Sequence, residues 1–386
     1  MVLEDNLLER LRSRASEYDR RNAFFAEDLD DLVEAGYMTM FVPGEFGGQG
    51  VTLPHMTEIQ MALAGAAPAT ALSVNMHQIW IGVARSVHAR NDAGLDWLFS
   101  DAMAGEIFGF GISEAGNDLV LLGSTSQARP TDDGGYTFHG TKIFTSNSPG
   151  WTKLGTFGFD DTDPDDAKNV YAFINRSGGG FEIKDDWDTL GMRASQSCTT
   201  VLNGAYAPAE QVLRRLEPGP NPDPLIFGIF ANFEILVAAV YAGIAQRALD
   251  LAVETVATRT SLAAGGTPYA HDPEIRRQIA VAAMELDKVL VHIKSIAQDV
   301  ESIGGSQPVD HGGFWFPRLS AVKIHSTETA RNVVDAAMRV SGGGSFFTKN
   351  ELSRLYRDVA AGIFHPSSDR STHASWAGAL LGPLPQ

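Results

Sequence analysis

The spacing of hydrophobic residues divides the chain into three zones. In the first 104 residues, apolar side chains recur at intervals of three and four positions, as in Leu7, Leu8 and Leu11, which predicts amphipathic helices. Residues 41–50 (FVPGEFGGQG) interrupt the pattern, because their glycines and proline cannot lie inside a helix. We therefore expect a helical N-terminal domain over residues 1–104 that contains one loop.

Short alternating runs replace the helical spacing after residue 104. Residues 125–130 and 136–144 read as two strands around the turn sequence at 132–135 (DDGG), and residues 170–174 and 199–206 read as two more. The middle zone, residues 105–220, is therefore expected to be a β domain of the sandwich or barrel type.

Helical spacing returns in the last zone, residues 221–386. Residues 225–260, 273–303 and 317–340 are long enough for long helices, and residues 349–358 for a shorter one. Long helices that are apolar toward one another usually pack as an antiparallel bundle, here of four helices. The order of helices, strands and helices predicts an α+β protein.

The charge and the single cysteine narrow the function classes. Lysine and arginine number 30 and aspartate and glutamate 47, so the formal net charge is −17, which disfavours nucleic acid or an anionic membrane as a partner. Cys198 stands alone and allows no internal disulfide, which fits a reducing, cytoplasmic location. We expect no signal peptide, and no membrane span because Glu234 and Arg247 interrupt the longest apolar stretch.

Four short sequence motifs occur in a characteristic order along these three zones. They are residues 110–118 (FGISEAGND), 140–147 (GTKIFTSN), 190–195 (LGMRAS), and 340–344 (VSGGG) closed by 354–358 (RLYRD). With these motifs the chain resembles the acyl-CoA dehydrogenase superfamily of flavoproteins over essentially its whole length. The resemblance implies a helical, β and four-helix-bundle architecture and an FAD cofactor.

The first two motifs suit a flavin ring physically. A flavin is a flat apolar surface with a polar edge, so it needs apolar side chains on its face and hydrogen bonds at its rim. The resemblance assigns this contact to one strand and to the next, with the following residues: Phe110, Ile112, Ser113, Phe144 and Ser146. The alternative is that the two phenylalanines are ordinary core aromatics.

The resemblance assigns the other end of FAD to residues of the helical half. Arg259 is expected on the pyrophosphate, where a guanidinium fork matches two oxygens, and the alternative is a solvated helix arginine. Gly342 and Gly343 would let the backbone approach the cofactor of a neighbouring subunit, so a homo-oligomer, a dimer or a homotetramer, is implied. Ser368 is counted among the expected cofactor contacts. No metal is expected.

The catalytic base is the point at which the chain departs from the family. Many members place a glutamate eight residues after the Arg-Asp pair, and that position is Pro366 here. Glu234, on the predicted first bundle helix, is the provisional base, although the position equivalent to a second subclass is Phe233. One residue turns a helical side chain by about 100°, so the alternative is that Glu234 forms a structural ion pair.

His365, immediately before Pro366, supports a different chemistry. Some superfamily members hydroxylate substrates with reduced flavin and oxygen, and they resemble this chain in placing a histidine before the missing glutamate. His365 and Ser146 would then lie in the active site. The alternative is that His365 only caps the end of a helix.

Three functions follow from these residues. The first is an FAD-dependent oxidoreductase that carries out α,β-dehydrogenation of an acyl-CoA thioester, with an electron-transfer flavoprotein as its partner. The second is a two-component flavin-dependent monooxygenase supplied by a flavin reductase. The third is a non-catalytic protein that binds FAD or acyl-CoA.

Overall fold

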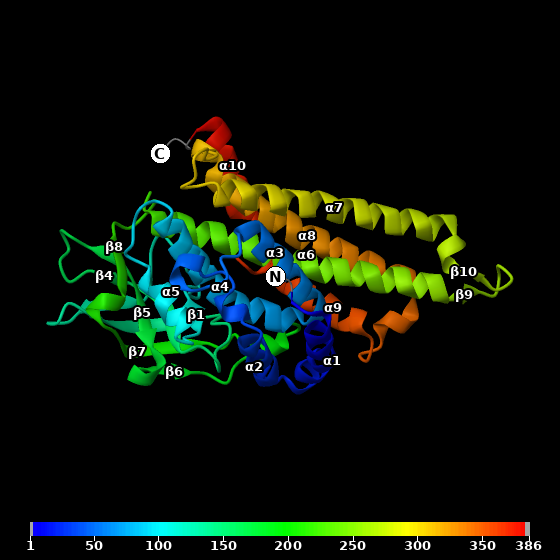
Figure 1. Cartoon of the computed structure of the whole chain (residues 1–386), viewed down its shortest axis with the longest axis horizontal. Helices are drawn as coiled ribbons and strands as arrows, with labels where there is room; N and C mark the ends of the chain where they lie inside the picture. The colour runs from blue at the N-terminus through cyan, green and yellow to red at the C-terminus, as the bar shows by residue number, and fades with distance from the viewer. Residues whose placement is uncertain (1–2, 383–386) are drawn as a thin grey trace.

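The fold joins a β-sheet domain to a long helical bundle through a layer of buried helices (Figure 1). The structure is a computed structural model, and it describes residues 3–382. The N-terminal helices are α1 Asp5–Arg21, α2 Ala26–Glu34, α3 Leu53–Ala66, α4 Pro68–His88 and α5 Trp97–Met103. Residues 41–50 form the expected loop, which contains only a single short 3-10 turn at Gly44–Phe46.

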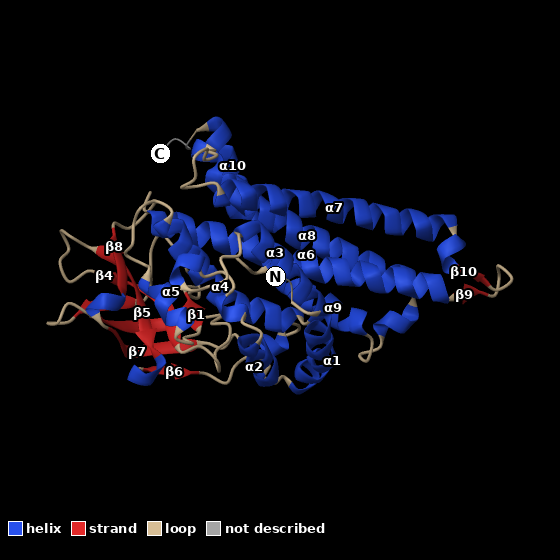
Figure 2. Ribbon diagram, viewed as in Figure 1, coloured by secondary structure: helices blue, strands red, loops and turns tan. Residues whose placement is uncertain are grey.

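The sheet lies at one end of the molecule (Figure 2). Its strands are β1 Phe108–Gly111, β2 Gln127–Pro130, β3 Tyr136–Lys142, β4 Lys153–Asp160, β5 Lys168–Asn175, β6 Phe181–Ile183, β7 Thr200–Ala207 and β8 Val212–Leu216. Their order is β6-β7-β3-β2-β4-β5-β8, with β1 paired to β4. Both β1 and β2 run parallel to β4, and the other pairs are antiparallel.

The C-terminal helices confirm the predicted bundle. They are α6 Pro224–Thr258, α7 Pro273–Glu301, α8 Trp315–Ser341, α9 Glu351–Val359 and α10 Asp369–Leu381. Figure 1 shows α6, α7 and α8 as long rods side by side, with the short strands β9 Thr260–Ser261 and β10 Thr267–Pro268 at the tip farthest from the sheet. Aspartates cap two of these helices: Asp223 accepts from the backbone of α6 and Asp272 from that of α7.

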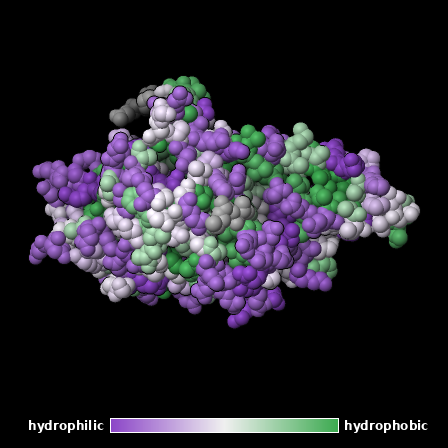
Figure 3. Space-filling view, in the orientation of Figure 1, coloured by the Kyte–Doolittle hydropathy of each residue, from purple (hydrophilic) through white to green (hydrophobic). Residues whose placement is uncertain are grey.

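Helix α6 is the centre of the helical core. It packs against α3, α4, α7 and α8, and its side chains are apolar nearly all round, as expected of a buried helix. Helix α6 is also long and apolar enough to cross a membrane, but 83% of its most apolar window is buried inside the protein. It is therefore a core helix in this fold. On the face seen in Figure 3, hydrophilic residues cover much of the surface, and hydrophobic residues gather over parts of the bundle.

Helix α4 couples the bundle to the sheet. The Trp80 indole nitrogen donates to the Gly109 carbonyl of β1 at 2.9 Å. The same ring packs against β4 so closely that a Cβ on Gly155 would lie 2.3 Å from it. Strand β1 is thus held between α4 and β4, and the residues that follow β1 are directed toward the helical half.

This contact predicts that Gly155→Ala destabilises the protein. The added methyl group has no room beside Trp80, so the free energy of unfolding should fall by about 1–3 kcal/mol in urea denaturation. Gly178→Ala is the matched control, because a Cβ there meets no atom within 4 Å, and it should change stability by less than about 0.5 kcal/mol. Equal stability of the two variants would contradict the proposed packing.

Candidate active site

A cavity of about 500 Å³ opens where the sheet domain meets the helical half. Its walls come from the end of β1, the segment after β3, the loop at 187–192, helices α4 and α6, and the segment after α9. Most lining side chains are apolar, and a few hydroxyl, amide and titratable groups converge among them. A concave apolar site with a small number of polar groups is typical of cofactor and small-molecule binding.

The structure brings together all five side chains expected at the flavin ring. The cavity is lined by Phe110, Ile112, Ser113, Phe144 and Ser146. Only Phe110 belongs to a strand, because β1 ends at Gly111 and β3 ends at Lys142. The others lie on the turns that follow those strands, so the expectation that two strands carry them needs this correction.

These side chains fit a planar ring with a polar edge. Phe110 stacks on Phe233 of α6, with ring centroids 5.5 Å apart. Phe144 sits at φ +56° and remains 52% exposed beside the Trp187 ring. Ser146 bonds Ser197 at 2.8 Å, which places a chain of hydroxyls at the rim. Apolar faces and nearby hydroxyls are what a flavin ring requires.

His365 lines the same cavity and is bonded to Tyr241 of α6. The Tyr241 oxygen lies 2.7 Å from Nε2 of His365. Tyr241 is fully buried, and burial raises the pKa of its hydroxyl well above the ordinary value, so it keeps its proton. Since Nε2 is the hydroxyl's sole partner among the described residues, the hydroxyl donates and Nε2 accepts. The ring proton of the neutral imidazole is then on Nδ1.

The electrostatic surroundings keep this imidazole uncharged. Burial lowers the pKa of His365 to about 3, and the nearby Lys323 ammonium contributes in the same direction. No described residue bonds Nδ1, so this nitrogen remains able to donate to a ligand. The site therefore offers a fixed, neutral N–H donor at neutral pH.

Glu234, the provisional base, does not line the cavity. Its neighbour Phe233 does, and Glu234 is turned to the other side of α6, where it is 1% exposed. The Ser367 hydroxyl donates to its Oε1 at 2.6 Å. Burial raises the pKa of the Glu234 carboxyl, although Ser367 and the Lys323 charge act against this rise. The one-residue offset seen in the sequence thus directs Glu234 into a buried polar network.

Glu114, the other carboxylate near the cavity, is fully engaged. It forms a buried ion pair with Lys142 at 2.5 Å and accepts further hydrogen bonds from Asn117, Ser124, Thr125 and Ser126. Burial alone would raise the pKa of Glu114, but the Lys142 charge and these hydrogen bonds lower it well below its ordinary value. Glu114 thus braces the cavity wall, and its oxygens are occupied.

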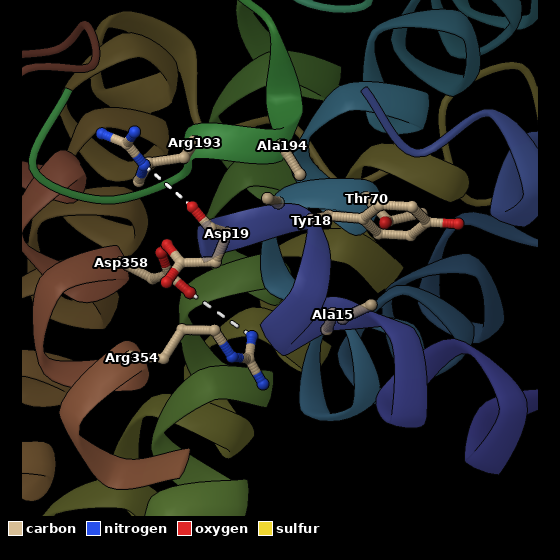
Figure 4. Close-up of a pocket in the computed structure, with 10 residues that line it drawn as sticks. Ala15, Tyr18, Asp19, Thr70, Arg193, Ala194, Arg354 and Asp358 are labelled. Atoms are coloured by element: carbon tan, nitrogen blue, oxygen red, sulfur yellow. Dashed lines mark hydrogen bonds and ion pairs between the residues drawn. The ribbon is translucent and has the colours of Figure 1, made fainter. Parts of the chain in front are cut away.

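Charged groups of α9 fasten the 187–192 loop. Figure 4 shows a neighbouring contact, in which the Arg193 guanidinium donates to the Asp19 carbonyl. The Met192 N–H donates to Asp358 at 2.7 Å, and Arg357 forms two hydrogen bonds to Asp19 of α1. A Cβ on Gly191 would lie 2.2 Å from the Arg357 carbonyl, so a glycine is required at this contact. Arg357 lines the cavity, but its charge is already paired.

The remaining predicted cofactor residues lie elsewhere. Arg259 donates to the Ser341 carbonyl beside Gly342, at the tip of the bundle that bears β9 and β10 in Figure 1. Arg259, Gly342 and Gly343 do not line the cavity of their own chain. Ser368 caps α10, where its hydroxyl accepts from the Ser371 N–H at 3.2 Å.

Two residues of this site were not found from the sequence. Tyr241 lies seven residues after Glu234, and that spacing puts both on one side of α6, so the pattern held a usable signal. Lys323 is fully buried on α8. A lysine within an apolar helical stretch is an indication of a buried partner, although sequence alone does not identify it.

The chain is similar to known proteins along most of its length. Residues 3–87 match the model of the acyl-CoA dehydrogenase N-terminal domain, and residues 235–370 match that of the C-terminal domain. A putative acyl-CoA dehydrogenase of Bacillus subtilis is 28% identical, over 94% of this chain and 91% of the relative. A dibenzothiophene monooxygenase of Rhodococcus erythropolis is 27% identical, over 93% and 88%.

A solved structure extends the similarity to the fold. KijD3 in complex with FMN and dTDP-3-amino-2,3,6-trideoxy-4-keto-3-methyl-D-glucose is 25% identical, with a TM-score of 0.85. The similarity covers 98% of this chain and 91% of that one. The similar proteins therefore include one described as a dehydrogenase, one described as a monooxygenase and one with a bound flavin.

The buried pair beside the cavity predicts a large stability effect. Glu114→Gln leaves the Lys142 charge buried without a partner and should lower the free energy of unfolding by about 3–5 kcal/mol in urea denaturation. The double variant Glu114→Gln with Lys142→Met removes both charges and should recover most of that loss.

Asp161→Asn is the control for this prediction. It removes an exposed ion pair with Arg129, so it should cost less than about 1 kcal/mol. Stability of Glu114→Gln equal to that of Asp161→Asn would show that Glu114 does not compensate a buried charge.

Proposed function

The chain belongs to the acyl-CoA dehydrogenase superfamily, and from that premise we propose that it is a flavin-dependent monooxygenase that acts with reduced flavin and oxygen. This is the second of the functions expected from the sequence. Acyl-CoA dehydrogenation, the first, remains the competing hypothesis.

The observation that carries the proposal is the set of titratable groups around the cavity. Three such groups line it, and two of them are engaged, Glu114 with Lys142 and Arg357 with Asp19. The third is His365. Removing the proton alpha to a thioester carbonyl requires a base within reach of the substrate. The Tyr241 hydroxyl occupies Nε2 of His365, and the other ring nitrogen carries the hydrogen, so the ring has no free nitrogen to accept this proton.

The neutral His365 ring suits oxygen transfer better than proton abstraction. With Nε2 held by Tyr241, the Nδ1 proton can be donated to an oxygen or heteroatom in the cavity. The Ser146 hydroxyl, bonded to Ser197, adds a second donor at the cavity wall. In this proposal both groups bind and orient the reactants, and neither has to carry a charge at neutral pH.

The residues proposed to hold the flavin are those that give the cavity its flat walls. Phe110, Ile112 and Phe144 would pack on the ring faces, and Ser113 and Ser146 would bond its edge. Reduced flavin supplies the two electrons with which one atom of O₂ enters the substrate and the other leaves as water. We retain FAD as the expected form, with Arg259 on its pyrophosphate and with Gly342 and Gly343 reaching the cofactor of a second copy in a homo-oligomer.

The cavity also points to the kind of substrate. Among the described residues, the lining includes no cation free to bind a diphosphate, because the Arg357 charge is paired with Asp19. The apolar wall formed by Leu72, Met76 and Phe364 favours a small, neutral and planar compound. An aromatic heterocycle meets these requirements better than a nucleotide-linked sugar or a coenzyme A thioester.

Two assays distinguish the monooxygenase from the dehydrogenase. The purified protein should consume oxygen and insert one labelled atom of ¹⁸O₂ into an aromatic heterocycle such as dibenzothiophene when reduced FMN or reduced FAD is supplied. A panel of acyl-CoA thioesters should leave the protein-bound oxidised flavin yellow under anaerobic conditions. Bleaching by any thioester of the panel would overturn the proposal in favour of the dehydrogenase.

The His365–Tyr241 pair predicts two graded losses. His365→Ala removes the Nδ1–H donor and should lower kcat by about 100-fold or more. Tyr241→Phe keeps the imidazole but leaves Nε2 without its hydrogen-bond donor. The ring hydrogen can then lie on either nitrogen, only one of the two tautomers offers the Nδ1–H donor, and kcat should fall by about tenfold. Because the folded pKa lies well below the ordinary value of about 6.5, His365 should cause no loss of rate between about pH 8 and pH 5.

His292→Ala serves as the control, because His292 lies on α7, contacts His325 and does not line the cavity. Its kcat should match that of the unmodified protein. A fall in rate near pH 6.5 that disappears in His365→Ala would contradict a neutral imidazole.

A further inference from the structure

The segment that carries His365 has little regular structure of its own. Residues 362–368, here called the His365 segment, connect the 3-10 turn Ala360–Ile363 to α10, and residues 364–368 form no helix or strand. A single short-range backbone bond, from Phe364 to Ala361 at 3.0 Å, lies at its start. Its shape must therefore come from contacts with the rest of the protein.

Lys323 of α8 supplies the main contact. Its ammonium group donates to the carbonyls of Gly362, His365 and Ser367, at 2.9, 2.7 and 3.0 Å. A lysine has three N–H donors, so this one is satisfied completely by the His365 segment. Lys323 is fully buried and does not line the cavity.

Helix α6 grips the same segment from the other side. Tyr241 bonds the His365 ring, and Glu234, on the same side of the helix, accepts from the Ser367 hydroxyl. Ser320, one turn before Lys323 on α8, bonds that hydroxyl as well, at 3.1 Å. Side chains from two helices thus hold both the backbone and the ring of the His365 segment.

Glu234 also balances the charge of this cluster. Burying an ammonium group in an apolar interior is costly unless an opposite charge lies nearby. Glu234 interacts electrostatically with Lys323, and its Oε2 is buried without a hydrogen bond among the described residues. Helix α6 places this carboxylate behind the segment, away from the cavity.

We propose that Lys323 is a positioning residue for His365: its three hydrogen bonds fix the His365 segment, and Glu234 is its buried counter-charge. Lys323 does not line the cavity, so it acts through the segment. The inference rests on the proposed function insofar as that function assigns the imidazole a part in turnover. Whether Lys323 fixes the His365 segment can be tested without measuring turnover.

Amide hydrogen exchange on the flavin-free protein tests the hold directly. Lys323→Met removes the ammonium group and should speed exchange in the peptide covering residues 362–368 by about tenfold or more. Ser326→Ala is the matched control, because Ser326 lies one turn further along α8 and donates to the Ala238 carbonyl of α6 at 2.6 Å, away from the segment. It should change that exchange by less than about twofold.

Lys323→Met leaves the Glu234 carboxylate without its counter-charge, and a second variant keeps the test open if the protein then fails to fold. Lys323→Met combined with Glu234→Gln removes both charges and should loosen the segment to the same degree. Glu234→Gln alone keeps an acceptor for Ser367 and all three lysine bonds but leaves the Lys323 charge buried without its counter-charge, so the urea midpoint of unfolding should fall while kcat of the folded protein stays within about threefold of the parent. Loss of more than about 100-fold in kcat from Glu234→Gln alone would overturn the counter-charge role and restore Glu234 as a base.

Turnover then shows whether Lys323 acts through His365. With reduced flavin and oxygen, Lys323→Met should lower kcat by about 30-fold with little change in KM, and it should lower it no further in a His365→Ala background. The inference would be overturned if the losses in kcat from Lys323→Met and His365→Ala multiplied in the double variant. It would also be overturned if Lys323→Met left amide exchange in the segment unchanged. Faster exchange with undiminished turnover would support the hold on the segment and would instead contradict the part assigned to His365.

Discussion

The hydrogen bond between the Tyr241 hydroxyl and Nε2 of His365 decides which proton the cavity can offer. A buried tyrosine that keeps its proton makes Nε2 an acceptor, so the imidazole carries its hydrogen on Nδ1. Burial keeps the ring neutral, and the Lys323 charge reinforces this. A neutral donor fixed at the wall of an apolar cavity favours binding and orienting a reactant over removing a weakly acidic proton.

The other charged residues that the structure describes at the cavity wall, Glu114 and Arg357, are paired, which explains the apolar character of the site. Glu114 is tied to Lys142, and Arg357 to Asp19. Glu234 faces a buried serine on the far side of α6. These groups stabilise the walls of the cavity. Glu114 supports the turn after β1, Arg357 fastens the 187–192 loop, and Glu234 supports the segment after α9. The charges therefore position the walls without entering the cavity, whose chemistry is left to hydroxyls and one imidazole.

The sequence predicted the helices and the residues that line the cavity better than it predicted the chemistry. The spacing of three and four identified α6, α7 and α8, and the first two motifs identified the five side chains that meet at the cavity. Strand β4 was missed because it is buried along nearly its whole length, and such a run lacks the alternation that identifies a half-buried strand. The direction of Glu234 depends on how α6 rotates against its neighbours, and the Lys323 contacts join residues about 40 positions apart, as with His365 at a separation of 42. Neither property is encoded in local spacing.

The protonation of His365 is the quantity on which this account depends, and nitrogen NMR measures it directly. With ¹⁵N-histidine labelling, and His365→Ala to assign the signal, long-range proton–nitrogen spectra distinguish a protonated ring nitrogen from a bare one. The account predicts a neutral His365 ring with hydrogen on Nδ1 and none on Nε2, unchanged from about pH 8 to about pH 5. A ring that becomes positively charged near pH 6.5, or that carries its hydrogen on Nε2, would contradict it.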